Sequence, residues 1–152
     1  MLKKIVFAAI FIVILKEPSL ACSCRGGVEI DEKFNSADVV FIGKCILSEL
    51  IEERGSVRNT FIIQSIWKGA SNNKSIITET NVDSDSCGFY FKPGFSYIVF
   101  GYIKDGITHT GQCLGNRTVG YYPERIDPRA QDEIKTLNEI SETIKQQTPN
   151  QH

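Results

Sequence analysis

The 152-residue sequence contains few of the side chains on which most enzymes depend. It has only two histidines, His109 and His152, and it lacks the motifs H-E-x-x-H, C-x-x-C and G-x-S-x-G. His109 adjoins a predicted strand, so we interpret it as a strand or edge residue and not as a catalyst. The formal net charge is −1 and no basic stripe is present, which argues against nucleic-acid binding. We therefore expect a protein that is not an enzyme, has no cofactor of its own and does not bind nucleic acid.

Long apolar runs are also scarce. Ile5–Leu15 is the one such run, and it is about half the length that a helix needs to span a bilayer. Two lysines precede it, and the small residues Ser19 and Ala21 stand three positions and one position before a potential cleavage point. These features predict a secretory signal peptide over residues 1–21, with cleavage before Cys22 and no membrane span.

The position of Cys22 also allows a second interpretation of this segment. A bacterial lipoprotein signal would attach a lipid to a cysteine at this place, but it prefers a branched apolar residue where this sequence has Ser19. We expect a secreted protein, extracellular or periplasmic, and keep a lipid anchor through Cys22 as the alternative.

Residues 22–147 are long enough for one domain with one core, and residues 148–152 are expected to be disordered. Without three lysines and one glutamate of the signal peptide, 14 basic and 17 acidic side chains remain, a net charge of −3. Runs rich in β-branched residues, separated by turn residues, predict a short helix and then five strands. The helix is expected within Val28–Ala37, and the strands at Asp38–Ile51, Val57–Trp67, Lys74–Thr80, Phe95–Ile103 and Ile107–Thr110.

A helix is predicted near the C-terminus. Asp127 can cap it, Pro128 fits its first turn, and apolar residues then recur at helical spacing at Ile134, Leu137, Ile140 and Ile144. Several strands followed by a helix predict a mostly β protein, a small closed barrel with flanking helices. In the first strand, alternation predicts one face carrying Val39, Phe41, Gly43, Cys45 and Leu47.

The five cysteines are interpreted as a disulfide framework, because the chain is expected to be secreted. Cys45 lies mid-strand on an apolar face and is expected to be the free thiol. Cys22 and Cys24 then pair with Cys87 and Cys113, and spacing alone does not choose between the two connectivities.

Several short motifs, in this order, resemble the N-terminal, netrin-like domain of the tissue inhibitors of metalloproteinases. The C-x-C start after a signal cleavage site is the most specific of them. The motifs are Cys22–Cys24, Ala37–Lys44, Asp85–Phe89, Phe95–Phe100, Lys104–Gly106 and Gln112–Cys113. In length, the chain is similar to single-domain bacterial relatives of that family.

The resemblance implies an oligonucleotide/oligosaccharide-binding type of barrel with bridges Cys22–Cys87 and Cys24–Cys113. It also implies a monomeric inhibitor whose partner is a zinc metalloendopeptidase. The α-amine and carbonyl oxygen of Cys22 would chelate the zinc of the protease, and Ser23 would enter its specificity pocket. The remaining contacts would come from Cys24, Arg25, Asp83, Ser84, Asp85 and Ser86.

The sequence departs from the family at two places. Gly26 stands where members usually have proline, and Gly27 follows it, which makes this segment more flexible. Phe34 stands where a third bridge would begin. The alternative function is a secreted netrin-like module that binds proteins without inhibiting a protease.

Overall fold

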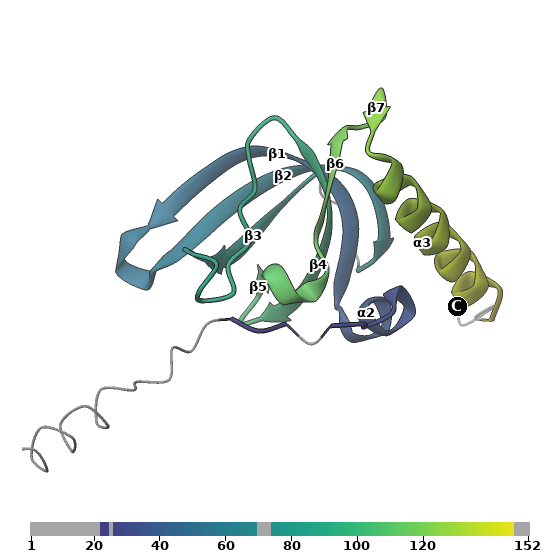
Figure 1. Ribbon diagram of the computed structural model, residues 1–152, viewed down its shortest axis with the longest axis horizontal. Coiled ribbons are helices and arrows are strands. Elements are labelled where there is room, and N and C mark those ends of the chain that lie inside the picture. Colours follow the sequence, from purple (N-terminus) through teal and green to yellow (C-terminus); the bar gives the residue numbers. More distant parts are fainter. Residues whose placement is uncertain (1–21, 25, 70–73, 148–152) are drawn as a thin grey trace, which may run out of the picture.

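The computed structural model describes residues 22–24, 26–69 and 74–147, so the predicted signal peptide and the predicted disordered tail lie outside the described residues (Figure 1). Within them, no helix is long and apolar enough to cross a membrane. The helices are α2 (Ile30–Ser36) and α3 (Pro128–Gln147), with short 3-10 turns η1 (Glu52–Arg54) and η2 (Gln112–Leu114). The strands are β1 (Val39–Ile51), β2 (Ser56–Lys68), β3 (Ser75–Asn81), β4 (Ser96–Lys104), β5 (Ile107–His109), β6 (Arg117–Tyr121) and β7 (Arg125–Ile126).

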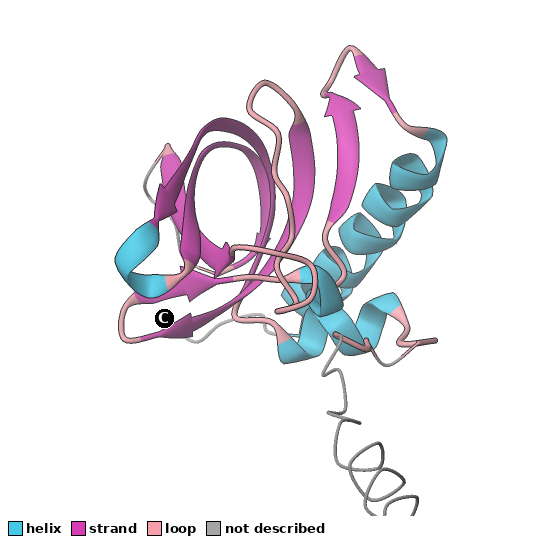
Figure 2. Cartoon of the chain, turned by 60° about the vertical axis from the view of Figure 1, so that its left-hand side comes forward, coloured by secondary structure: helices cyan, strands magenta, loops and turns pink. Residues whose placement is uncertain are grey.

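Five strands form a closed ring. Hydrogen-bonded neighbours follow the order β1-β2-β3-β5-β4, and β4 pairs with β1 to close the ring. All these pairs are antiparallel except β3 with β5, which is parallel. The curved strands surround a common interior, and α3 packs on the outside (Figure 2). The expectation of a mostly β protein with a closed five-stranded sheet and a C-terminal helix is confirmed.

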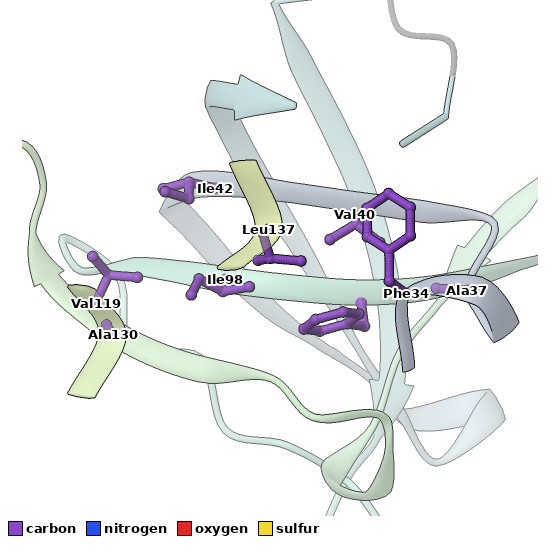
Figure 3. Close-up of a cluster of buried hydrophobic side chains, with 9 residues drawn as sticks. Phe34, Ala37, Val40, Ile42, Ile98, Val119, Ala130 and Leu137 are labelled. Carbon is purple, nitrogen blue, oxygen red and sulfur yellow. The ribbon is translucent and has the colours of Figure 1, made fainter. Parts of the chain in front are cut away.

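Both faces of β1 are buried over its first five residues, 39–43. Val40 and Ile42 pack in a cluster with Phe34 of α2 and Leu137 of α3 (Figure 3). The opposite face, toward the inside of the ring, carries Phe41, which belongs to a second cluster with aromatic residues of β2, β4 and the segment before β4. One apolar cluster lies on each face of this strand. Residues that point to either face are therefore apolar, and the strand is a nearly continuous apolar run.

One detail of the predicted β1 pattern is wrong. Alternation places Leu47 on the same face as Phe41 and Cys45, both of which are fully buried, yet Leu47 is 45% exposed. The register with β2 shifts between Cys45 and Leu47, which is a β-bulge. A bulge adds one residue to one strand, so the side chains beyond it change face.

The segment between β5 and α3 contains two strands that the sequence patterns did not predict. β6 pairs with β4, and β7 pairs with β6, so they extend the sheet beyond the ring. Residues Tyr121 to Pro123 include the end of β6 and part of the turn to β7.

Asp127 caps α3 as predicted. Its carboxylate accepts a hydrogen bond from the backbone N–H of Arg129 at 2.9 Å, and Pro128 occupies the first helical position. The predicted apolar stripe is buried at Leu137 and ends before Ile144, which is 42% exposed.

Replacing Leu137 by alanine should lower the free energy of unfolding by about 2–5 kcal/mol, because it leaves a cavity between α3 and the sheet. Urea unfolding followed by circular dichroism measures this loss. The exposed Lys135→Ala on the same helix is the matched control and should change stability by less than about 0.5 kcal/mol. Equal effects of the two changes would contradict the packing described for α3.

Candidate functional site

Two disulfides fix the segment Cys22–Cys24 to the rest of the molecule. Cys22 is bonded to Cys87 and Cys24 to Cys113, the connectivity that the family resemblance implies. The Cα atoms of the bonded pairs are 5.1 and 5.0 Å apart, and the sulfurs of Cys22 and Cys113 approach to 3.5 Å. The two bridges are therefore adjacent. Because all four sulfurs are part of disulfide bonds, they offer no thiolate to a metal ion.

The second segment of the site, Asp83–Cys87, is a turn held by its own hydrogen bonds. The carboxylate of Asp83 accepts hydrogen bonds from the backbone N–H and the hydroxyl of Ser86, both at 2.7 Å. The backbone N–H of Cys87 donates to the carbonyl of Ser84 at 3.1 Å. The two hydrogen bonds from Ser86 lower the pKa of the Asp83 carboxyl.

The two segments touch through the backbone as well as through the disulfide. The backbone nitrogen of Cys22 donates a hydrogen bond to the carbonyl oxygen of Asp85 at 3.2 Å. The residues Ser23, Ser84 and Asp85 are exposed around this contact. We refer to Cys22–Cys24 together with Asp83–Cys87 as the two-segment site.

Seven of the eight residues that the resemblance implies for the site lie in these two segments, and Arg25 lies outside the described residues. Among the seven, Ser86 differs in kind from Ser23 and Ser84. Its hydroxyl is bonded to Asp83, so its role in the structure is to hold the turn. Ser84 and Asp85 are the exposed residues at the tip of that turn.

Three residues that support the turn escaped the sequence analysis. The side-chain amide of Asn81 donates to the carbonyl of Ser86. A Cβ at Gly88 would lie 2.2 Å from the carbonyl oxygen of Asn81, and one at Gly111 would lie 2.7 Å from that of Cys87. Only glycine allows backbone segments to approach so closely. Gly88, directly after Cys87, was the feature of the sequence that could have indicated this close approach of two backbone segments.

Acid should loosen the turn. The pKa of Asp83 is lowered in the folded protein, so its contribution to order is present above the pKa of an unfolded aspartate, about 3.9, and is lost as the pH falls through the folded value. We expect the amide signal of Ser86 to shift and its hydrogen exchange to accelerate only below about pH 4, in an NMR titration. In Asp83→Asn the same signals should show no such transition. A transition that persists in this variant would assign it to another group.

Cys45 is the free cysteine, as predicted, and it is fully buried. Its thiol donates to the carbonyl of Leu47 at 3.5 Å, and burial raises the pKa of this thiol. A buried, protonated thiol is a poor nucleophile, so Cys45 serves as a small core residue.

Comparison with known proteins gives one informative relative. No family model matches the chain. The chain is 35% identical over 101 residues to an NTR domain-containing protein from Margaritifera margaritifera, and the match covers 63% of this chain and 68% of the relative. The name of that relative states a domain and no activity.

Proposed function

This chain belongs to the NTR-domain, or netrin-like, family, and on that premise we propose that it inhibits zinc metalloendopeptidases by chelating their catalytic zinc through Cys22. A catalytic zinc keeps one coordination position for water or substrate. The α-amine would take the position of the water, and the carbonyl oxygen of the same residue would bind as a second donor, because a catalytic zinc can expand to five ligands. The proposal requires cleavage after Ala21, because the nitrogen of Cys22 must be a free amine.

The anchoring of Cys22 is the observation that carries the proposal. Two adjacent disulfides hold the segment, and the Cys22 nitrogen is hydrogen-bonded to Asp85. A segment that is already ordered loses little conformational entropy when it docks into a cleft. After cleavage before Cys22, the hydrogen bond to Asp85 would use one hydrogen of the neutral amine and leave the nitrogen lone pair available for a metal.

The protonation state of the amine makes the proposed inhibition depend on pH. An α-amine has a pKa of about 8, so a useful neutral fraction exists at pH 7 and zinc favours the neutral form further. Affinity should weaken as the pH falls below about 8, because zinc must then compete with a proton for the amine.

The remaining exposed residues supply the proposed protease contacts. Ser23 follows the chelating residue and would enter the main specificity pocket of the protease. Ser84 and Asp85 would lie against the cleft beside it. Arg25 would continue along the cleft after Cys24.

A stoichiometric titration tests the proposal. The oxidised protein beginning at Cys22 is added to a zinc endopeptidase at a concentration well above the expected Kd, with and without a hydroxamate that occupies the active-site zinc. We expect a one-to-one end point, and competition between the protein and the hydroxamate. Inhibition without competition would place the contact outside the active site and contradict the chelate.

A non-inhibitory protein-binding module is the second candidate, because family membership alone supports it and the relative is named only by its domain. The absence of inhibition across several metalloendopeptidases would favour this function. Under either function we propose a secreted protein. A lipid anchor at Cys22 would need the sulfur that is bonded to Cys87 in the structure, so the disulfide speaks against this alternative. The two disulfides agree with an oxidising compartment. Lipidation normally acylates the amine as well, so it would be incompatible with the chelate.

A further inference from the structure

The two disulfides that anchor the two-segment site touch one another through their sulfur atoms. Sγ of Cys113, which belongs to one bridge, lies 3.5 Å from Sγ of Cys22, which belongs to the other. A thiolate breaks a disulfide by attacking one of its two sulfur atoms. Cys113 is therefore in place to attack the Cys22–Cys87 bridge whenever its own bridge to Cys24 is open.

The two bridges differ in their exposure to solvent. Cys24 and Cys113 are both exposed, whereas Cys22 and Cys87 are half-buried. Access is one of the factors that set the rate at which a dissolved thiol attacks a disulfide. A small thiol therefore reaches the Cys24–Cys113 bridge first, and its attack on Cys24 leaves a thiolate on Cys113.

Cys113 keeps its place when this bridge opens, because other contacts hold its segment. The turn η2, which follows β5 and carries Cys113, lies beside the start of the described chain (Figure 1). The backbone N–H of Gln112 donates to the carbonyl of Cys87 at 2.9 Å. The side-chain amide of Asn116 donates to the carbonyl of Gly111 at 3.0 Å, and its oxygen accepts a hydrogen bond from a backbone N–H of β4 at 2.9 Å. A reacting group held at contact distance reacts far faster than the same group free in solution.

The backbone at Cys87 favours the exchange in this direction. Cys87 has a φ of 65°, a left-handed conformation that is unfavourable for a residue with a Cβ atom. The bridge to Cys22 is one of the constraints on this residue. Attack on Cys22 releases Cys87 from that constraint, so its backbone can relax toward a more favourable conformation.

The fifth cysteine is kept out of this chemistry. Cys45 is fully buried in β1, and burial raises the pKa of its thiol. It is neither accessible to a dissolved thiol nor present as the reactive thiolate. Exchange is therefore confined to the four cysteines that anchor the two-segment site.

We propose that these four cysteines form a thiol–disulfide exchange site whose substrate is a low-molecular-weight thiol. The thiolate of that molecule bonds to Sγ of Cys24, and the bond between Cys24 and Cys113 breaks with its electron pair on Cys113. Sγ of Cys113 then bonds to Sγ of Cys22, and Cys87 leaves as a thiolate that takes a proton from water.

A second molecule of the thiol completes the reaction. Its thiolate bonds to the first thiol in the mixed disulfide, and Cys24 leaves as a thiolate that is then protonated. Two thiols are thus oxidised to one small disulfide. The protein is reduced by the same two electrons, and it exchanges its two bridges for the single bridge Cys22–Cys113, with free thiols on Cys24 and Cys87.

The exchange would regulate the two-segment site, a consequence that rests on the proposed function. Cys22 stays anchored through Cys113, but its segment loses the covalent link to Asp83–Cys87, and Cys24 is no longer bonded. Docking into a protease would then require more ordering of the chelating segment and the turn, so the affinity should fall.

Partial reduction followed by disulfide mapping tests the exchange. The oxidised protein beginning at Cys22 is treated with reduced glutathione, sampled over time, and blocked with N-ethylmaleimide before unfolding. Fragmentation of the tryptic peptide 22–25 in a mass spectrometer distinguishes Cys22 from Cys24. Among molecules with one bridge, we expect Cys22–Cys113 to dominate, with Cys87 blocked. Dominance of either original bridge, or resistance of both bridges to glutathione, would overturn the proposal.

Two single substitutions form a matched pair for this test. Cys24→Ser and Cys113→Ser remove the same bridge, but only the first leaves the attacking thiol on Cys113. Without added thiol, we expect Cys24→Ser to contain the bridge Cys22–Cys113 and a free thiol on Cys87. Cys113→Ser should keep Cys22–Cys87. The bridge Cys22–Cys87 in both variants would refute the attack by Cys113.

An inhibition assay on the same samples separates this inference from the proposed function. Inhibition should fall in proportion to the rearranged fraction, and full inhibition by the rearranged protein would refute the regulation. A protein that rearranges but never inhibits a protease would support the exchange and refute the proposed function. A protein that inhibits and keeps Cys22–Cys87 throughout would refute the exchange alone.

Discussion

A protein that retains Ala21 should inhibit a zinc endopeptidase at least about a thousandfold more weakly than the protein beginning at Cys22, a loss of about 4 kcal/mol. Ala21 would convert the amine of Cys22 into an amide, whose nitrogen has no basic lone pair for zinc. The extra residue would also occupy the space beside the metal, where the protease keeps its open coordination position. Inhibition constants measured for the two proteins under one set of conditions give this ratio.

The comparison is informative because both proteins keep the same disulfides. Non-reducing mass spectrometry and circular dichroism check that the extension changes neither the bridges nor the fold. Carbamylation of the Cys22 amine should have the same effect as the extension, since it also removes the lone pair. Equal inhibition by the extended and the processed protein would mean that protease binding uses another surface.

The second large effect is expected on stability. Replacing Cys24 and Cys113 together by serine removes a bridge between residues 89 positions apart, and should lower the free energy of unfolding by about 4 kcal/mol in the chain-entropy model. The same change releases the backbone at position 24, two residues after the chelating Cys22, so inhibition should weaken as well. Urea unfolding and inhibition assays on the same preparation measure both losses.

Cys45→Ala is the matched control for this double substitution. It removes a cysteine but leaves both bridges, so its cost should be about 1 kcal/mol, and inhibition should be unchanged. A double variant as stable as the control would show that the Cys24–Cys113 bridge adds nothing to the fold.

The strands of the ring could be predicted because their apolar residues are β-branched and end at turn residues. The turn at Lys104–Gly106 is an example: Asp105 and Gly106 both have positive φ, which is the conformation that a tight hairpin turn requires. Cys45 could be predicted as the free thiol because it lies within an apolar strand.

Other features depend on contacts between distant segments, which a single sequence does not specify. The bulge after Cys45 moves Leu47 to another face, and no residue in β1 marks it. β6 and β7 have five and two residues, and β6 contains Gly120, so neither has a long apolar run. They form because β4 offers a free edge beside residues 96–98.

The candidate site was predictable in its residue types and only partly in its geometry. The C-x-C start and the family resemblance implied the bridges that the structure contains. The contact between the Cys22 nitrogen and Asp85, and the turn that Asp83 holds, depend on a loop more than sixty residues away along the chain.

The most direct test of the chelate is the visible absorption spectrum of a metalloendopeptidase that carries Co²⁺ in place of zinc. The account predicts that the cobalt bands change in proportion to added protein beginning at Cys22, reach an end point at one equivalent, and do not change with the protein that retains Ala21. Complete inhibition by the protein beginning at Cys22 with an unchanged cobalt spectrum would contradict direct ligation of the metal by Cys22.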